Sequence, residues 1–322
     1  MPTRSATWRP TVSVVIPSVG KPGLRRAVES VLAQTHPVTE VHVVLNSETD
    51  VDLPGDPRVR LLRYLERRNG NAARMAGVRR CTGDLVAFLD DDDLWHPTKI
   101  ERQVRDIAEA GLADSSTWIS STKVVVDFAH GSETWPRAPY DPSLSLENNL
   151  LQRHRVQRGQ AFLPSSTLLF PRSLPMTVPL NEELSLHQDL TWLLQLSRTL
   201  PDLAVRQVDA ALTRYDAIGD GISRSISLDR ELDWAREYLG SATPRDRGDY
   251  YLGSVMTYAR RQGTVGGMVG VFSEGLRVGR PGAAAVGYAC GAMAAGVVKA
   301  VAAGVRQPRR RGDETDAGAE VR

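Results

Sequence analysis

Short β-branched apolar runs alternate with segments of helical periodicity over the first hundred residues, and this alternation limits the choice of fold more than any other feature. Two segments have helical spacing, 24–32 and 71–81. Four runs predict buried strands, the first of them ended by Pro17: 12–16, 41–45, 59–64 and 85–89. Strands that alternate with helices predict an α/β fold with a mostly parallel sheet flanked by helices.

The periodicity changes after about residue 110. Further strands and helices are predicted at 124–128, 167–170, 185–200, 203–208 and 228–262. The polar, proline-containing stretch at 131–165 is longer than an ordinary loop in a compact domain, so we expect it to be functional. We therefore expect an α/β domain over 11–225, a helical C-terminal extension over 226–306 and a disordered tail over 307–322.

Composition excludes several classes of protein. The chain has 322 residues, 41% hydrophobic and 24% charged, which is typical of a soluble globular protein and not of a collagen-like or wholly disordered one. Its two cysteines, Cys81 and Cys290, lie far apart and form no zinc or disulfide pattern, so we expect reduced thiols. A net charge of +2 argues against nucleic acid as a partner. Residues 1–11 carry no apolar signal region, which predicts a cytoplasmic location.

The segment at 281–305 is rich in alanine and glycine and contains one charged residue, Lys299. Three interpretations remain open: a membrane span, a helix lying on a membrane surface or partner, and a helix buried against the rest of the chain. Arg309–Arg311 follow closely and would suit the anionic inner face of a membrane. Peripheral membrane contact through the C-terminal helices is therefore one expectation.

Four consecutive aspartates, Asp90–Asp93, follow directly after the predicted strand at 85–89. Adjacent carboxylates repel one another, and a hard divalent cation with oxygen ligands would offset that repulsion. Ligands of open α/β sheets bind beyond the carboxyl ends of the strands, so this run is placed to hold a metal ion against phosphates. Alternatively, the aspartates favour the positive end of a helix predicted at 94–107.

The order and spacing of several segments resemble the nucleotide-binding half of the family 2 glycosyltransferases. The segments are VSVVIPSVGK at 12–21, ARMAG at 73–77, TGD at 82–84, FLD at 88–90 and WHPTKIE at 95–101. The resemblance is dense over 11–105, looser over 106–225 and absent beyond. It implies the Rossmann-like GT-A fold, with a nucleotide-binding half at 11–110 and an acceptor half at 111–225.

The resemblance also implies how the nucleotide is bound. Pro17 and Ser18 would lie where the first strand meets the base and ribose, and Arg74 matches a family arginine near the nucleotide. The second strand ends in Leu45-Asn46, where the family usually has Asp-Asp or Asp-Asn. Asn46 can still hydrogen-bond a base, whereas Leu45 cannot replace a carboxylate, which weakens the expectation of a uridine donor.

Asp90, Asp91 and Asp92 cover the family's Asp-x-Asp motif. The resemblance implies that Asp90 and Asp91 lie at the nucleotide, where one of them touches the ribose. It also implies that Asp92 binds Mg²⁺ or Mn²⁺ bridging the diphosphate. Such a cation would neutralise the leaving group as its bond to the sugar breaks.

A second constellation lies at 186–196 (LHQDLTWLLQL), which resembles a family helix that carries the general base. In inverting members that aspartate takes the proton of the acceptor hydroxyl, a role implied here for Asp189. Asp189 could equally cap its helix. Glu182 and Glu183 are the next candidates for the base, and His187 is expected to be a satisfied wall or surface residue.

Two arginines resemble parts of the family segment that closes over the diphosphate. Arg214 or Arg224 could hold a phosphate bidentately, or both could lie in a solvated loop. Trp95, after the aspartate run, is expected to anchor packing more than to stack on a sugar.

These expectations favour a metal-dependent, inverting glycosyltransferase that moves a hexosyl group from a nucleotide-diphosphate sugar to an acceptor hydroxyl. The acceptor would be a saccharide or a lipid-linked saccharide in polysaccharide or glycoconjugate biosynthesis at the cell envelope. A nucleotidyl- or phosphosugar-transferring enzyme is an alternative that would not need Asp189. A further alternative is a degenerate, non-catalytic member that binds at a membrane or in a complex.

Overall fold

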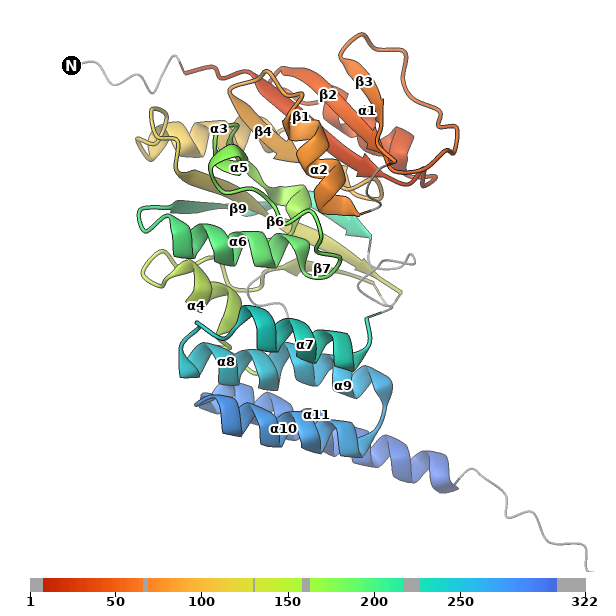
Figure 1. The fold of residues 1–322 in the computed structure, drawn as a ribbon, viewed down its shortest axis with the longest axis vertical. Coiled ribbons are helices and arrows are strands. Elements are labelled where there is room, and N and C mark those ends of the chain that lie inside the picture. Colours follow the sequence, from red (N-terminus) through yellow and green to blue (C-terminus); the bar gives the residue numbers. More distant parts are fainter. Residues whose placement is uncertain (1–7, 66–68, 130, 158–162, 217–225, 306–322) are drawn as a thin grey trace, which may run out of the picture.

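The computed structural model describes residues 8–65, 69–129, 131–157, 163–216 and 226–305. Figure 1 shows an α/β part that contains the sheet, and below it layers of helices formed by the C-terminal part of the chain. The predicted α/β class and the helical C-terminal extension are thus confirmed. The expected tail at 307–322 lies outside the described residues.

Nine strands of the described chain form one sheet in the order β3-β2-β1-β4-β8-β6-β9-β5, with β7 paired to β6. They are β1 (Val12–Ser18), β2 (Val38–Leu45), β3 (Val59–Arg63), β4 (Leu85–Phe88), β5 (Leu94–Trp95), β6 (Trp118–Phe128), β7 (Gly131–Trp135), β8 (Leu169–Pro171) and β9 (Ala204–Asp216). The β3-β2-β1-β4 half is parallel, and so is the long β6–β9 pair. Antiparallel pairs join β4 to β8 and β8 to β6.

The first strand does not end at Pro17, as its sequence predicts, but continues to Ser18. Proline lacks an amide hydrogen, so the direction of its nitrogen matters. The Ser18 carbonyl accepts from β2, through the Asn46 amide, and the Val15 carbonyl accepts from the β4 side, through the Leu89 amide. Alternation along the strand turns Pro17 to the β4 side, where β4 has already ended opposite Val15. No ladder bond is therefore lost.

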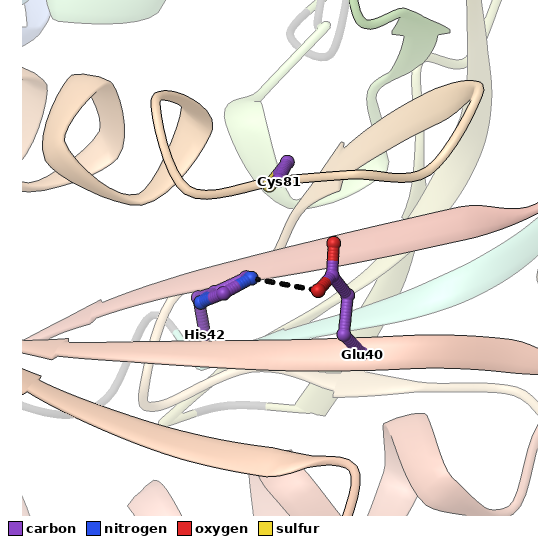
Figure 2. A group of neighbouring side chains, drawn as sticks. All are labelled: Glu40, His42 and Cys81. Carbon is purple, nitrogen blue, oxygen red and sulfur yellow. Dashed lines mark ion pairs between the residues drawn. The ribbon is translucent and has the colours of Figure 1, made fainter.

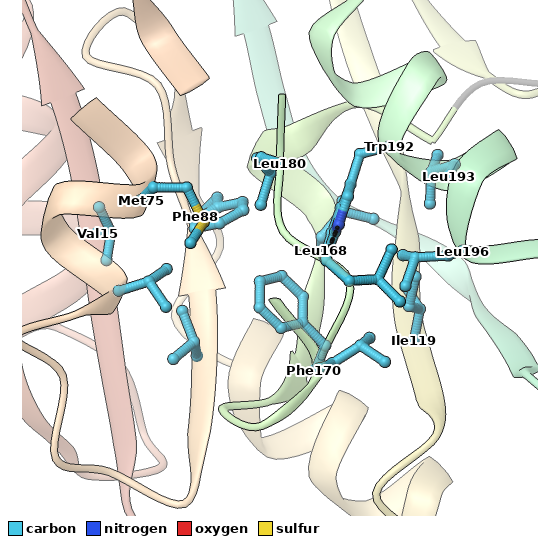
Figure 3. Close-up of a cluster of buried hydrophobic side chains, with 14 of the residues drawn as sticks. Val15, Met75, Phe88, Ile119, Leu168, Phe170, Leu180, Trp192, Leu193 and Leu196 are labelled. Carbon is cyan, nitrogen blue, oxygen red and sulfur yellow. Dashed lines mark hydrogen bonds between the residues drawn. The ribbon is translucent and has the colours of Figure 1, made fainter. Parts of the chain in front are cut away.

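Helices cover both faces of the sheet (Figure 1). Those of the α/β part are α1 (Leu24–Leu32), α2 (Gly70–Val78), α3 (Lys99–Glu109), α4 (Leu146–Leu151), α5 (Leu174–Thr177) and α6 (Gln188–Thr199). Alternate residues of β1 face opposite sides, so Val14 belongs to the core beneath α1 and α3. Val15 belongs to the core beneath α2 and α6, which Figure 3 shows. In that core, Phe170 meets Phe88 and Trp192 edge-on, at centroid distances of 5.0 and 5.1 Å.

Two local predictions are wrong. The helix predicted at 94–107 begins only at Lys99, because Leu94 and Trp95 form β5 against β9 and Pro97 disfavours helix in the residue before it. The stretch at 131–165 is not one long loop, because it contains β7 and α4. Trp95 is the packing anchor expected, since it is 4% exposed and its indole donates to the Ser166 carbonyl at 2.7 Å.

The C-terminal extension packs around a second core, to which Leu151 of α4 and Leu194 of α6 also contribute. Its helices are α7 (Leu228–Tyr238), α8 (Pro244–Tyr250), α9 (Met256–Gln262), α10 (Val265–Val278) and α11 (Ala283–Val305). A capping box at Thr243 and Asp246 begins α8. One face of α11 is buried in this core through Ala285, Ala289 and Ala292. Among the described residues, no helix is both long and apolar enough to cross a membrane.

Candidate active site

The four aspartates follow β4 at the carboxyl end of the parallel half of the sheet. Asp91 and Asp93 are buried, at 4% and 0% exposure. The side chains of Asp90 and Asp92 are 30% and 33% exposed. The two accessible carboxylates, Asp90 and Asp92, are thus separated by one residue. The helix-end alternative is wrong, because α3 begins six residues after the run.

Arg74 of α2 joins three segments that are distant in sequence. Its guanidinium is buried and donates to Asp90 Oδ1 at 2.6 Å, to Ser165 Oγ at 3.0 Å and to Gln188 Oε1 at 2.9 Å. Asn69 begins the helix by accepting from the Ala72 amide, which sets Arg74 on the turn that faces the aspartates. The fork of the guanidinium suits this divergent set of acceptors.

Ser165 links the aspartate run to Asp189. Its hydroxyl donates to Asp90 Oδ2 at 3.1 Å, and its amide donates to Asp189 Oδ2 at 3.3 Å. The structure therefore brings Asp90 and Asp189 to the same site, although 98 residues separate them in the sequence. Ser165 was not predicted, because it lies at the end of the polar stretch at 131–165 and no local pattern distinguishes it.

Asp189 lies within the first turn of α6 and is not its N-cap. The N-cap is His187, in a left-handed conformation with φ 48° and without a capping side-chain bond, so the capping alternative is wrong. Asp189 Oδ1 accepts from the Leu190 amide at 2.8 Å. His187 Nε2 lies 2.6 Å from a Glu231 carboxylate oxygen, and its ring meets Trp234 edge-on. His187 is thus a satisfied structural residue, as expected.

The other predicted nucleotide-site residues lie at the carboxyl ends of β1 and β2. Ser18 Oγ donates to Asp91 Oδ2 at 2.6 Å. Burial raises the pKa of Asp91, against the opposing effects of this hydrogen bond and of Lys21. The backbone N–H of Asn46 donates to the Ser18 carbonyl, and the side-chain amide of Asn46 donates to the Tyr64 carbonyl at 3.0 Å. The structure thus gathers Pro17, Ser18 and Asn46 at one edge, next to the aspartates.

Lys21 is a site residue that the sequence analysis missed. Its ammonium lies 2.6 Å from Asp92 Oδ2 and 3.5 Å from Asp91 Oδ1. Partial burial lowers the pKa of Lys21, but the hydrogen bond that its ammonium donates to Asp92 and the charge of Asp91 outweigh this and raise it. Repulsion within the aspartate run is therefore offset by protein cations, Arg74 and Lys21. The available signal was a lysine three residues beyond the strand end in VSVVIPSVGK.

The donor set at Asp92 fits a hard divalent cation. Asp92 offers carboxylate oxygens, and its side chain is partly open to solvent. Mg²⁺ in particular is usually held by one or two carboxylates, with phosphates and water completing its shell. A site built on Asp92 would therefore need oxygens from a bound diphosphate.

Two pockets are lined by residues that the sequence analysis singled out. One of about 310 Å³ includes Asp92, Arg26 and Arg214 among its lining residues. Asp127 also lines this pocket, and Arg214 donates two hydrogen bonds to it. Arg214 and Asp127 therefore form an ion pair in the free protein. A larger pocket, of about 570 Å³, is lined mainly by residues 136–155 of the polar stretch that we expected to be functional. Arg224, the other predicted phosphate clamp, lies outside the described residues.

Glu40, His42 and Cys81 form a separate buried group whose ligand atoms lie within 4.8 Å of one another (Figure 2). Glu40 already accepts from the Ser13 hydroxyl and from both the amide and hydroxyl of Thr82. Arg60 pairs with its second oxygen at 3.0 Å. Because these donors use the carboxylate, we interpret the group as a structural link between β1, β2 and the turn before β4.

Comparison with known proteins identifies the family of the chain. A family model described as "Glycosyl transferase family 2" matches residues 13–173, half of the chain. TuaG of Bacillus subtilis (strain 168), described as a teichuronic acid biosynthesis glycosyltransferase, is 38% identical over 176 residues. That match covers 49% of this chain and 68% of TuaG.

Two other relatives match over shorter stretches. The succinoglycan biosynthesis protein ExoO of Rhizobium meliloti (strain 1021) is 37% identical over 91 residues, which cover 27% of this chain and 26% of ExoO. An uncharacterized glycosyltransferase of Rickettsia felis is 34% identical over 113 residues, 33% of this chain and 19% of its own length. Among solved structures, S. aureus TarS 1-349 in complex with UDP-GlcNAc aligns with a TM-score of 0.49 and 16% identity, over 83% of this chain and 72% of that one. By the family match and the similarity to TuaG, the chain belongs to glycosyl transferase family 2 and is a glycosyltransferase.

Proposed function

We propose that the protein transfers a sugar from a nucleotide-diphosphate donor to an acceptor hydroxyl, with inversion and with the aid of Mg²⁺ or Mn²⁺. The observation that carries this proposal is the hydrogen-bonded chain from Asp90 through Ser165 to Asp189, held by Arg74. It joins an accessible carboxylate pair to a third carboxylate on a different element. Such an arrangement offers a donor site and a base next to each other.

On this proposal the donor nucleotide lies along the carboxyl ends of β1 and β2, against Pro17, Ser18 and Asn46. Asp90 would contact the ribose, and Asp91 would hold Ser18 in place from its buried position. Asp92 would hold the divalent cation, which would neutralise charge on the leaving diphosphate. Arg74 would keep Asp90 oriented.

Asp189 would act as the general base. A base must come within hydrogen-bond reach of the proton that it removes. Asp189 is partly exposed, and backbone amides of Ser165 and Leu190 fix its carboxylate. These two amides hold the carboxylate in a fixed orientation at the start of α6. Attack by the activated hydroxyl on the face opposite the diphosphate gives inversion.

We propose a saccharide or lipid-linked saccharide as the acceptor, in polysaccharide biosynthesis. The descriptions of TuaG and ExoO place those relatives in such pathways. The pocket of about 570 Å³ combines polar side chains with Tyr140 and several prolines, a lining suited to a sugar.

We also propose that α11 lies on the surface of a membrane, at the inner face of that membrane. From Ala283 to Val298 the helix has no charged residue, and Val297 and Val298 are 45% and 69% exposed. A surface helix normally carries charges on its outer face. Arg309–Arg311 follow in the sequence and would complement anionic lipids. Flotation with anionic and neutral vesicles tests this: Val298→Glu should weaken binding to anionic vesicles, and equal flotation of both proteins would overturn it.

Calorimetric binding of UDP, GDP, TDP and CDP, with and without Mn²⁺, tests the proposed function. We expect one nucleotide to bind in a metal-dependent way, and Asp92→Asn to lose that dependence. Asp202→Asn removes an exposed carboxylate after α6 and serves as the matched control. If no nucleotide binds to the folded wild-type protein, the proposal is wrong and the non-catalytic alternative is favoured.

A further inference from the structure

The ion pair between Lys21 and Asp92 places a protein cation where the proposed function needs a metal ion. The Lys21 ammonium lies 2.6 Å from Asp92 Oδ2 and reaches Asp91 Oδ1 at 3.5 Å. Mg²⁺ binds carboxylate oxygens at about 2.0–2.1 Å. An ammonium and a divalent cation cannot both contact Asp92 Oδ2 from the side that faces Asp91. A metal ion that binds this oxygen between the two carboxylates therefore requires Lys21 to move.

Two glycines bring Lys21 to this position. Gly20 adopts φ 88°, in the left-handed region that favours glycine, and its amide donates to Ser18 Oγ. Gly23 lies so close to the aspartate run that a Cβ atom there would be 2.8 Å from the Asp91 carbonyl oxygen. The backbone of the loop that carries Lys21 therefore lies directly against Asp91 and Asp92.

The ion pair is also open enough to exchange. The Lys21 side chain is 38% exposed and the Asp92 side chain 33%. Pairs of this kind are weak, because water competes for both charges. Lysine carries a compact charge on a flexible stem, so the ammonium can turn to a new anion without moving the backbone. A diphosphate held by a metal ion at Asp92 would be the nearest such anion.

We propose that Lys21 is an exchangeable counter-ion of the donor site. In the free protein the Lys21 ammonium pairs with Asp92. When a nucleoside diphosphate binds together with a metal ion, Lys21 leaves Asp92, which is then free to bind the metal ion, and pairs with the diphosphate. This rests on the proposed function and adds a coupling between its two ligands. Metal alone binds weakly because it must displace Lys21, and the nucleotide relieves that competition. By linkage, metal strengthens nucleotide binding by the same factor.

The test measures Mn²⁺ binding alone, by the electron paramagnetic resonance signal of free Mn²⁺, and then with UDP, GDP, TDP or CDP. Lys21→Met removes the charge and keeps the length of the side chain. We expect it to bind Mn²⁺ alone about two- to fivefold more tightly than wild type, which is the range for a half-exposed pair. In saturating Mn²⁺ it should bind the nucleotide about tenfold more weakly, because a charge-assisted hydrogen bond is lost.

Two further variants make the result specific. Arg25→Met removes one positive charge four residues away, where Arg25 pairs with Asp52 and Glu29, and should bind Mn²⁺ as wild type does. Lys21→Arg restores a cation and should again bind Mn²⁺ alone weakly. Equal Mn²⁺ affinities of Lys21→Met and wild type would overturn the exchange and leave the Asp92→Asn result standing. Absence of nucleotide binding by wild type would overturn the proposed function and this proposal together.

Discussion

Arg74 Nη2 and Asp90 Oδ1 lie 2.6 Å apart and join α2 to the carboxyl end of β4. The guanidinium is almost fully buried, whereas the carboxylate keeps 30% of its side-chain surface exposed. The same guanidinium also reaches Gln188, the residue before Asp189. One buried cation therefore fixes the relative position of the candidate donor site and the candidate base.

Arg74→Met should lower the free energy of unfolding by about 2 kcal/mol. Removing one partner of a buried pair leaves polar groups without compensation, and the partial exposure of Asp90 reduces that penalty. We expect turnover to fall by more than tenfold, because Asp90 and Asp189 lose their common support. Urea denaturation and initial rates measure the two effects. Arg80→Met removes an exposed arginine next to the same helix and should change stability by less than about 0.5 kcal/mol.

Asp189→Asn should lower turnover by about 10²–10⁴-fold, the usual contribution of a general base. The amide keeps the shape of the side chain, so nucleotide binding in Mn²⁺ should not change. Initial rates measure turnover, with a sugar donor that carries the nucleotide found to bind. Calorimetry measures nucleotide binding separately. Asp202→Asn, exposed beyond the end of α6, is the control and should retain wild-type rates. Unchanged turnover of Asp189→Asn would show that Asp189 is not the base and would favour Glu182 or Glu183 in that role.

The parallel half of the sheet could be predicted because its signals are local. β1, β2, β3 and β4 each coincide with a predicted apolar run to within a few residues. Buried strands of a parallel sheet need apolar residues on both faces, which produces the continuous runs of β1, β2 and β4. β3 is the partly exposed edge strand, and its run contains two arginines. The edge at which the aspartates lie follows from the same pattern, since the run comes directly after β4.

The contacts that complete the site could not be predicted, because they join residues distant in sequence. Lys21 meets Asp92, and Ser165 meets both Asp90 and Asp189, only after the chain has folded. Tertiary pairing also overrode local propensity at Trp95, which forms β5 opposite Thr213 in place of the first turn of a helix. Sequence periodicity carries no information on such pairing.

Gly77→Ala should destabilise the protein by about 1–3 kcal/mol, the usual effect of overpacking. A Cβ atom at Gly77 would lie 2.4 Å from Val15 Cγ1, because α2 approaches the sheet closely here. Thermal and urea unfolding measure the change. Gly270→Ala in α10 meets no atom within 4 Å and is the control. It should be neutral or stabilising by up to about 1 kcal/mol, since alanine favours helix. Equal stability of the two variants would contradict the close contact.

Glu40 should contribute stability that disappears in acid. Burial raises the pKa of Glu40, but hydrogen bonds from Ser13 and Thr82 and the charge of His42 outweigh this and lower the pKa from 4.5 to about 2. A pKa lowered by folding stabilises the protein above the unfolded value, and the contribution is lost as pH falls towards the folded value. The full effect is about 3 kcal/mol, at 1.36 kcal/mol for each unit.

Urea unfolding between pH 7 and pH 2.5 of two proteins, His42→Val and the double variant Glu40→Gln/His42→Val, measures this contribution. His42→Val is used as the background because the imidazole faces the same carboxylate. We expect the difference in free energy of unfolding to be constant above about pH 5.5 and to shrink below pH 4.5. Glu29→Gln, which changes a half-exposed carboxylate on α1, should give a difference that hardly varies with pH. A Glu40→Gln difference that stayed constant down to pH 2.5 would show that the carboxylate is not held ionised by its hydrogen bonds.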